Sequence, residues 1–322
     1  MEKLKIGILG FGHFAEQTIM PAVRRTKTME LVAIQKRNLK AAEDKAKKYG
    51  IPFAYGGEEQ LLQNPEVEAV FIASSNNRHL PQTRLAAQFG KHVICEKPMA
   101  LTVAESEEMI RVCKEARVKL MIAHMLRYSK SVREAKAILE GGQLGNVRFA
   151  RSDFSIDANN SSRTWIDDPS VAGGGPIMDI GVHALDTIRF ILGGEIEDVH
   201  AFLEPPFTNQ QIEMDAQIGL RFSNRRFVSI QTSFRLFYET LIELQGTKAI
   251  LQLRNYSFNL GTGILTMIFP DLSEKRWLVE NGDFYKAELE AFARAVLNNE
   301  EPEIPGEEGL KNQIVLDQAY GK

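Results

Sequence analysis

The sequence predicts an α/β protein built in two parts. The N-terminal part is a doubly wound parallel sheet, and the C-terminal part is an α+β domain with a large, mostly antiparallel, open-faced sheet. As far as residue 124, short apolar runs alternate with helical patterns, as in a parallel sheet with helical crossovers. From Val147 onward, strand-like runs follow one another through short links, which is typical of an antiparallel sheet. The 322 residues suffice for two domains, which we place at residues 1–124 and 125–322.

Composition and charge exclude several classes of function. Apolar residues make up 44% of the chain and charged residues 25%, as in ordinary globular proteins. The net charge of −3 gives no reason to expect a nucleic acid or an anionic membrane as partner. No apolar run approaches the ~20 residues that cross a bilayer, and the N-terminus lacks a signal-peptide layout, so we expect a cytoplasmic protein. We expect Cys95 and Cys113 to be buried free thiols.

A glycine-rich turn follows the first predicted strand. The apolar run Leu4–Leu9 leads into the pattern G-x-G-x-x-A, and a helical pattern then continues to about Arg25. The first glycine permits a tight turn, the second lets the backbone approach a pyrophosphate, and the small third residue allows close helix packing. A purely structural glycine turn is the alternative. As the first of several strand–helix units, the pattern predicts a Rossmann dinucleotide site formed by Gly10, Phe11, Gly12, His13, Phe14 and Ala15.

The second predicted strand, residues 31–34, leads through Gln35 into two basic residues. An acidic residue at this position would bind a ribose 2′-hydroxyl, but the chain has Lys36 and Arg37 instead. These bases would attract a 2′-phosphate, and an arginine plane could also cover the adenine. Alternatively, they only open an exposed, lysine-rich helix. We favour NADP(H) as the preferred cofactor, with NAD(H) as the alternative.

The remaining elements of the first half alternate in the same way. The expected strands are 51–54, 68–73, 92–95 and 118–124, and the expected helices are 39–49, 58–63, 79–89 and 102–117, the last with a capping-box pattern at Thr102 and Glu105. Right-handed crossovers bring the strand ends near residues 10, 35, 74 and 96 to one edge of the sheet, where ligands bind. We assign further cofactor contacts there to Ser74, Asn76, His79, Glu96 and Lys97. For His79, the alternative is a helix-start or packing role.

Lys97 stands where the fifth predicted strand must stop. Pro98 has no N–H to donate and pushes Lys97 toward an extended backbone, which ends the strand at the ligand-binding edge. The simpler interpretation is an exposed lysine before a helix. In the context of the glycine turn, the position instead predicts a lysine near a nicotinamide ring.

The pattern of the second half predicts a large sheet with few helices. A helix is expected at 126–139, then strands at 147–156, 199–203, 214–222, 226–234, 240–245, 249–253 and 263–269, and helices at 284–298 and 309–320. A sheet with helices on one face leaves its other face to be covered. A partner subunit is the simplest cover, so we expect a homodimer or homotetramer formed through this sheet.

A triglycine segment interrupts this half. Gly173, Gly174 and Gly175 give backbone freedom, and Pro176 then starts a helix. Asp179 and His183 are four residues apart and share a helix face, which suits proton transfer to a ligand; Asp186 lies near the same face. The alternatives are a solvated Asp–His pair or metal ligation. No third and fourth ligand stand at a useful spacing, so we expect no metal.

Together these residues resemble the Gfo/Idh/MocA family (glucose–fructose oxidoreductase / inositol dehydrogenase). The resemblance covers nearly the whole chain. Its motifs are the glycine turn, Ser74-Ser75-Asn76 with His79, Gly90-Lys91-His92-Val93 leading into Glu96-Lys97-Pro98, Arg127-Tyr128, and the segment from Gly173 to His183. The combination of Glu-Lys-Pro with Asp-x-Gly-x-His is specific to this family.

The resemblance implies a nicotinamide-dependent oxidoreductase that acts on sugars, cyclitols or related polyols. Lys97 would orient the reacting oxygen, Asp179 would bind substrate hydroxyls or tune its neighbours, and His183 would be the general acid or base. The implied substrate contacts are Arg127, Tyr128, Arg163, Trp165, Asp179 and His183, with a packing role as the alternative for Trp165. Some family members hold the Lys-Pro peptide cis.

Three positions depart from the family pattern. Ser75 replaces a frequent proline, Lys36 replaces a common acid, and Met125 replaces the first residue of the usual Asn-x-Arg. The change at residue 36 agrees with NADP(H). Two other functions stay open: a dehydrogenase of a non-sugar cyclic diol, and a cofactor-binding regulator without catalytic activity.

Overall fold

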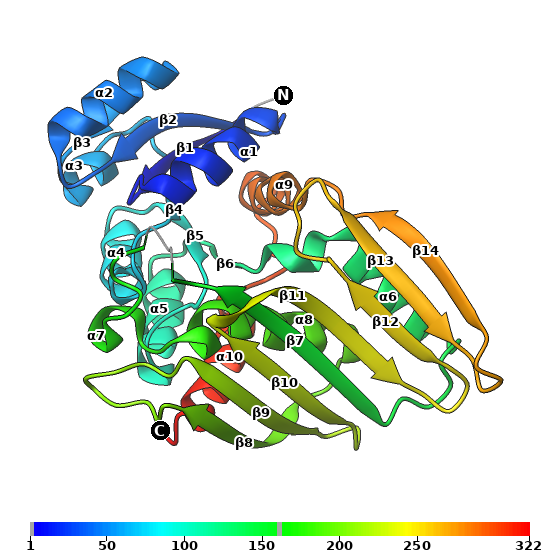
Figure 1. The fold of residues 1–322 in the computed structure, drawn as a ribbon. Coiled ribbons are helices and arrows are strands. Elements are labelled where there is room, and N and C mark those ends of the chain that lie inside the picture. The colour runs from blue at the N-terminus through cyan, green and yellow to red at the C-terminus, as the bar shows by residue number, and fades with distance from the viewer. Residues whose placement is uncertain (1–2, 160–162) are drawn as a thin grey trace. The chain divides into compact units, whose positions relative to one another are not determined.

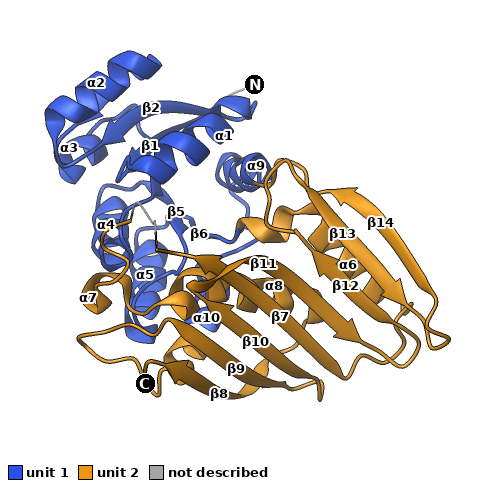
Figure 2. Cartoon of the chain, viewed as in Figure 1, with its two compact units in different colours: residues 1–124, 285–313 blue, residues 125–284, 314–322 orange. Residues whose placement is uncertain are grey.

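The computed structural model describes residues 3–159 and 163–322, and the chain divides into two compact units. The first unit comprises residues 1–124 and 285–313, and the second comprises residues 125–284 and 314–322 (Figure 2). Residues 285–313 therefore pack with the first unit, although the sequence placed all of 125–322 in the second domain. One reason is visible in the backbone, where the N–H of Ile122 donates to the carbonyl of Ile304 at 3.0 Å.

The first unit contains a six-stranded parallel sheet in the order β3-β2-β1-β4-β5-β6 (Figure 1). This is the strand order of a doubly wound dinucleotide-binding fold, so the predicted fold class of the first half is confirmed. Strands β1, β4 and β5 are almost wholly apolar and buried because helices cover both faces of such a sheet. The strands are β1 Leu4–Leu9, β2 Met29–Gln35, β3 Phe53–Tyr55, β4 Ala69–Ile72, β5 His92–Glu96 and β6 Leu120–Ala123.

The helices of this unit begin and end at recognisable residues. The Asn38 side chain accepts from the N–H of Ala41 to cap α2, and Gly50, with φ +63°, ends it. The Thr102 hydroxyl likewise caps α5, but the Glu105 carboxylate accepts from Leu101 N rather than from Thr102 N. The helical segments are η1 Ala15–Ile19, α1 Met20–Arg25, α2 Leu39–Tyr49, α3 Glu58–Leu62, η2 Asn76–Arg78, α4 His79–Gln88 and α5 Val103–Glu115.

The second unit contains an eight-stranded sheet in the order β14-β13-β12-β11-β7-β10-β9-β8. Neighbouring strands are antiparallel except for β7 and β10, which confirms the predicted mostly antiparallel sheet. The strands are β7 Phe149–Asp157, β8 Ile196–Glu204, β9 Asp215–Phe222, β10 Phe227–Ser233, β11 Arg235–Gln245, β12 Ile250–Arg254, β13 Thr262–Ile268 and β14 Glu274–Glu280.

Strand β14 was not expected from the sequence. It is an edge strand with the sequence Glu-Lys-Arg-Trp-Leu-Val-Glu, and only Trp277 and Val279 are even partly buried. Charged side chains suit an edge strand because they discourage pairing with another chain. The same charges remove the apolar alternation that would have identified the strand.

Helices cover one face of the large sheet. Helix α8 (Val182–Leu192) packs on β7, and α6 (Lys130–Glu140) packs on β12, β13 and β14 (Figure 1). Shorter segments are η3 Met125–Tyr128, α7 Pro169–Ala172 and η4 Ile177–Gly181, and the last two long helices are α9 Phe284–Leu297 and α10 Gly306–Ala319. Both cysteines, Cys95 and Cys113, are free and buried, as expected.

Candidate functional site

The glycine turn of the first unit has the geometry that a dinucleotide site requires. Gly10 has φ +75°, and a Cβ there would lie 2.8 Å from the Ser74 backbone, so only glycine fits. Ala15 is fully buried, which lets its helix pack close to the sheet. The Gln35 side chain, whose role the sequence did not indicate, links this turn to a second loop. Its oxygen accepts from the N–H of Gly10 at 3.1 Å, and its amide nitrogen donates to the carbonyl of Gly56.

The space over Gly12 is open. A Cβ added there would meet only the Gly10 carbonyl, at 3.8 Å, and both Gly12 and His13 are exposed. A helical segment starts at His13, so its first N–H groups lack partners within the helix and can bind an anion. These residues fit the pyrophosphate of a nicotinamide dinucleotide, which would lie over Gly12 against the N–H groups that follow.

Basic side chains follow β2, but Lys36 takes an orientation that the sequence could not indicate. Its ammonium donates to the Phe11 carbonyl at 2.5 Å, and burial lowers the pKa of this group. Arg37 is exposed. The nearby Glu16 carboxylate accepts from Lys45 at 2.5 Å and from Tyr49 at 2.6 Å, and these bonds lower its pKa. The Glu16 carboxylate is thus paired with a base.

His79 connects two loops at the same edge of the sheet. It is fully buried; Nδ1 lies 2.9 Å from the Pro98 carbonyl, and Nε2 lies 3.3 Å from the Ser74 carbonyl. Burial lowers its pKa to about 4. The imidazole is therefore neutral at pH 7, and it has a single N–H with which to donate to one of these two carbonyls. This geometry matches the packing role more closely than direct contact with a cofactor.

Lys97 and Glu96 stand at the carboxyl end of β5. The Lys97–Pro98 peptide is cis, and the Lys97 N–H donates to its neighbour's carboxylate Oε2 at 3.2 Å. Ser74, at the end of β4, donates from its hydroxyl to Gln82 at 2.6 Å. Asn76 is buried in the short η2 turn that follows.

Tyr285 is a residue of this unit that the sequence analysis missed. Its ring meets that of Phe14 edge to face, with centroids 6.2 Å apart. Burial raises its pKa, and the Glu96 charge adds to the shift. Tyr285 therefore belongs to the surroundings of the glycine turn. No local pattern could have identified it, because 271 residues separate it in sequence from Phe14.

In the second unit, the triglycine segment leads into the predicted acid–base helix. Gly173, with φ +81°, ends α7, and the helix continues from η4 into α8. Asp179 is only 8% exposed, and its two oxygens accept from the two terminal nitrogens of Arg163 at 2.7 and 2.6 Å. The Arg163 guanidinium lies 6.0 Å from the centre of the Trp165 ring. Three of the predicted substrate residues thus form one cluster, in which Arg163 aligns the Asp179 carboxylate.

His183 lies one turn further along the helix. It is 6% exposed, and its ring stacks on Phe154 of β7, with centroids 5.9 Å apart and planes at 26°. Because both Asp179 and His183 are buried, they are not the solvated surface pair that the sequence left open. Their carboxylate and imidazole are held by different partners, so each group has a fixed orientation.

Arg127 and Asp186 form a second bidentate pair. The Arg127 Nε donates to Asp186 at 2.9 Å and Nη2 at 2.7 Å, and both side chains are buried. Asp186 therefore pairs with Arg127, a partner that the sequence did not indicate. Tyr128 is buried too, with the Arg133 guanidinium 5.2 Å from its ring centre. The pair of Arg127 and Asp186 fixes helix α8 to the segment that follows residue 124.

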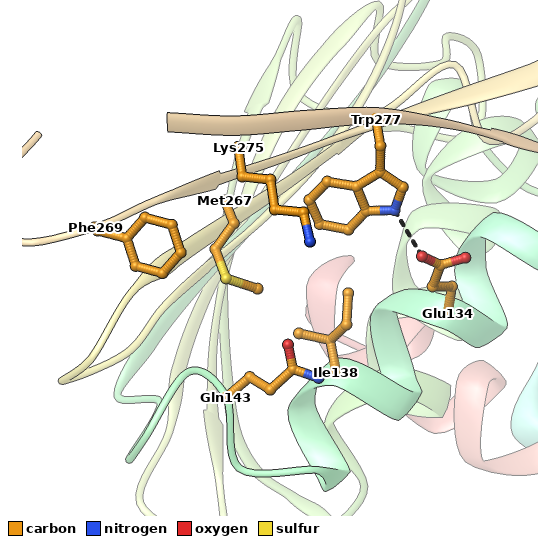
Figure 3. Close-up of a pocket in the computed structure, with 7 residues that line it drawn as sticks. All are labelled: Glu134, Ile138, Gln143, Met267, Phe269, Lys275 and Trp277. Atoms are coloured by element: carbon orange, nitrogen blue, oxygen red, sulfur yellow. Dashed lines mark hydrogen bonds between the residues drawn. The ribbon is translucent and has the colours of Figure 1, made fainter. Parts of the chain in front are cut away.

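One hollow of about 740 Å³ lies in the second unit between α6 and the strands β13 and β14. Figure 3 shows its lining residues, in which strand side chains face those of α6 and the turn after it: Glu134, Ile138, Gln143, Met267, Phe269, Lys275 and Trp277. None of the predicted site residues lines it. Among the described residues, no cluster of three or more histidine, cysteine or acidic side chains could hold a metal ion, and no helix is long and apolar enough to span a bilayer.

Known proteins match both units. Residues 4–124 match the model of the oxidoreductase family with an NAD-binding Rossmann fold, and residues 132–252 match the GFO/IDH/MocA C-terminal domain. D-xylose 1-dehydrogenase (NADP(+)) 2 of Haloferax volcanii is 30% identical over 98% of this chain and 96% of its own. 1,5-Anhydro-D-fructose reductase of Ensifer adhaerens is 29% identical over 94% and 91%. The structure of aldose-aldose oxidoreductase from Caulobacter crescentus superimposes with a TM-score of 0.90, at 28% identity over 99% and 97%.

The fold and the glycine turn define an NAD(P)-dependent oxidoreductase. The chain belongs to the Gfo/Idh/MocA family. The predicted family and the predicted class of enzyme are both confirmed. The individual site residues, the oligomeric state and a cytoplasmic location stay predictions.

Proposed function

We propose that the protein is an NADP(H)-dependent oxidoreductase that transfers hydride between nicotinamide and a sugar, a cyclitol or a related polyol or carbonyl compound. The observation that carries the proposal is the Asp179 cluster: a buried carboxylate held by Arg163, with the imidazole of His183 one turn along the same helix. The relatives that act on xylose and anhydrofructose support a substrate of this class.

Each catalytic group has a proposed role. The bound nicotinamide supplies or accepts the hydride. Lys97 stabilises negative charge on the substrate oxygen, and a positioned donor of this kind contributes a few kcal/mol. His183 exchanges the proton with that oxygen, as general acid in the reducing direction and general base in the other. Asp179, oriented by Arg163, accepts hydrogen bonds from substrate hydroxyls.

The remaining predicted site residues divide between the two ligands. For the cofactor, the turn from Gly10 to Ala15 binds the pyrophosphate, and Ser74, Asn76 and Glu96 stand at the strand ends beside it. For the substrate, Arg163 and Trp165 contribute the cluster around Asp179. Arg127 takes part by fixing helix α8, since its guanidinium is occupied by Asp186. Tyr128 stays a proposed substrate contact.

The preference for NADP(H) rests on Arg37 and Lys36. Arg37 is exposed after β2, and the nearby Glu16 carboxylate is already bound by Lys45, so a 2′-phosphate meets net positive charge. Arginine binds phosphate through its planar fork.

Nicotinamide fluorescence titrations test this preference. We expect NADPH to bind tens of times more tightly than NADH. Arg37→Ala weakens NADPH binding and leaves NADH binding unchanged, whereas Lys47→Ala, an exposed lysine on α2, changes neither. Equal binding of both cofactors by the wild type contradicts the NADP(H) assignment and keeps the fold.

A substrate screen with NADP⁺ and NADPH tests the reaction. We expect turnover of an aldose, a cyclitol or an anhydroketose, and a fall of about 10²-fold or more in turnover for Lys97→Ala, with cofactor affinity near normal. Lys114→Ala, an exposed lysine of α5, is the matched control. Unchanged turnover in Lys97→Ala removes this lysine from the mechanism. Turnover of cyclic diols alone favours the non-sugar alternative, and cofactor binding without any turnover favours a regulator.

We also propose that a second copy of the chain covers the open face of the large sheet. Successive side chains of β7 point to opposite faces of the sheet. Ser152 and Phe154 are buried under the helices, and Phe149 lies on the other face. Phe149 is 55% exposed and stacks on Phe227 of the neighbouring strand, at 5.8 Å, while Phe202 of β8 is 78% exposed. Light scattering should give a dimer or tetramer, and Phe149→Glu should dissociate it. A wild-type monomer contradicts the proposal.

A further inference from the structure

A buried carboxylate meets the start of the acid–base helix. Glu213, in the segment before β9, is fully buried and accepts three hydrogen bonds. The N–H of Gly175 donates to Oε2 at 3.0 Å, and the N–H of Ile177 donates to Oε1 at 3.0 Å. The hydroxyl of Tyr320, at the end of α10, donates to the same Oε1 at 2.8 Å.

Glu213 acts as a cap supplied from a distant part of the chain. The first N–H groups of a helix have no partners within the helix, and a carboxylate beside them is also favoured by the helix dipole. Between the two donors, Gly175 and Ile177, stands Pro176, which has no N–H. A single side chain therefore binds both backbone donors between residues 175 and 177.

The same contacts explain two of the three glycines. A Cβ on Gly174 would lie 2.0 Å from the Tyr320 hydroxyl, and one on Gly175 would lie 2.0 Å from the Glu213 carbonyl oxygen. Tyr320 is itself fixed, since its ring centre lies 4.7 Å from that of Phe207 and 5.2 Å from the Lys322 ammonium. The glycines thus allow close packing against this pair, in addition to the backbone freedom that the sequence suggested.

We propose that Glu213 and Tyr320 are positioning residues for catalysis, which hold the triglycine segment so that Asp179 and His183 keep their orientation. The connection is short, because the N–H of Asp179 donates to the Gly175 carbonyl at 3.1 Å. The inference rests on the proposed roles of Asp179 and His183. Both residues act through the triglycine segment, and neither need touch the substrate.

The variant Tyr320→Phe tests the proposal, because it removes one hydroxyl and keeps the ring packing. Trp277→Phe is the matched control: it also removes one donor to a carboxylate, the bond from Trp277 Nε1 to Glu134 at 2.6 Å. Each variant should lower the stability to unfolding to a similar extent, because each removes one hydrogen bond to a carboxylate. Stability therefore does not distinguish the two, and the readouts below do.

The first readout does not depend on activity. The chain has six histidines, so the ring-proton NMR spectrum of the full-length protein is simple, and His183→Gln identifies the His183 signal. We expect that signal and its titration to move in Tyr320→Phe and to stay in place in Trp277→Phe. An unmoved signal overturns the proposal, and this decision stands even if the wild type turns over no substrate and the proposed function fails.

The second readout is kinetic and uses a substrate that the wild type accepts. Misplacing a catalytic group by a fraction of an ångström to an ångström can cost up to about 10²-fold in rate, so we expect Tyr320→Phe to lower kcat by about ten-fold or more. NADPH affinity should not change, because the glycine turn belongs to the other unit. Glu213→Gln, which keeps the side-chain volume but places an amide against backbone donors, should lower kcat further. A kcat for Tyr320→Phe equal to that of Trp277→Phe contradicts the positioning role.

Discussion

Replacing His79 by glutamine should change how stability responds to acid. The imidazole is buried between the carbonyls of Pro98 and Ser74, and burial lowers its pKa from 6.5 to about 4. Glutamine keeps an amide donor for the nearer carbonyl but does not titrate. The substitution thus removes the titration while leaving a side chain that can still connect the two loops.

The size and sign of the effect follow from the two pKa values. The pKa of His79 is lower in the folded state than in the unfolded state, so between pH 6.5 and 4 the unfolded chain binds more protons. The free energy of unfolding therefore falls as the pH falls through this window. One pKa unit corresponds to about 1.4 kcal/mol, which gives a loss of ~2 kcal/mol between pH 7 and 5 and ~3 kcal/mol by pH 4. Above pH 7 the contribution is constant.

Urea unfolding of the full chain from pH 7 to 4.5 measures this difference. Carboxylates titrate in both proteins, so the wild-type curve minus the His79→Gln curve isolates the imidazole. We expect the variant to lose less stability on acidification, by roughly the amount given above. Parallel curves for wild type and His79→Gln would refute the low pKa and the buried neutral imidazole.

Three further substitutions or reactions give clear expectations. Gly12→Ala should weaken NADPH binding by about ten-fold or more in calorimetry, with the melting temperature little changed, because its Cβ meets no protein atom closer than 3.8 Å. Loss of folding instead would show that the space is not open. Asp186→Asn leaves the buried Arg127 guanidinium without its anion and should cost about 3–5 kcal/mol in urea unfolding, and a cost below 1 kcal/mol would contradict that pairing. Burial raises the pKa of Cys113 to about 12 and that of Cys95 well above its usual value, so iodoacetamide at pH 8 should label neither thiol until urea is added.

The sequence was informative wherever a feature depends on neighbouring residues. Helix α2, with Asn38 at its start and Gly50 at its end, has the predicted bounds because both signals are local. The alternation of strands and helices predicted the parallel sheet, and the glycine pattern placed Gly10 and Gly12 correctly at the end of β1. The triglycine segment likewise identified the start of the helix that contains Asp179.

The sequence could not indicate which distant residue each polar side chain binds. Lys36 binds the Phe11 carbonyl, 25 residues away, and Arg127 binds a carboxylate 59 residues away. The Tyr320 hydroxyl reaches Glu213 across 107 residues. Such pairs depend on how distant segments pack, and no periodicity or motif records them. The charged edge strand β14 was missed for a related reason, since its pairing with β13 is not visible in its own composition.

The path of the chain has a consequence for how the enzyme can be divided. The chain passes from one unit to the other at residues 124, 284 and 313, so the cofactor half is encoded in two separate stretches. In the whole chain, the carbonyl of Ile304 accepts from the N–H of Ile122 in the edge strand β6. A fragment that stops at residue 124 lacks this carbonyl and therefore exposes the β6 edge of the sheet. Exchanging cofactor halves between relatives therefore requires three crossovers in the gene, one at each of these points. A single protease cut between residues 125 and 284 would leave two peptides that still share one dinucleotide-binding unit.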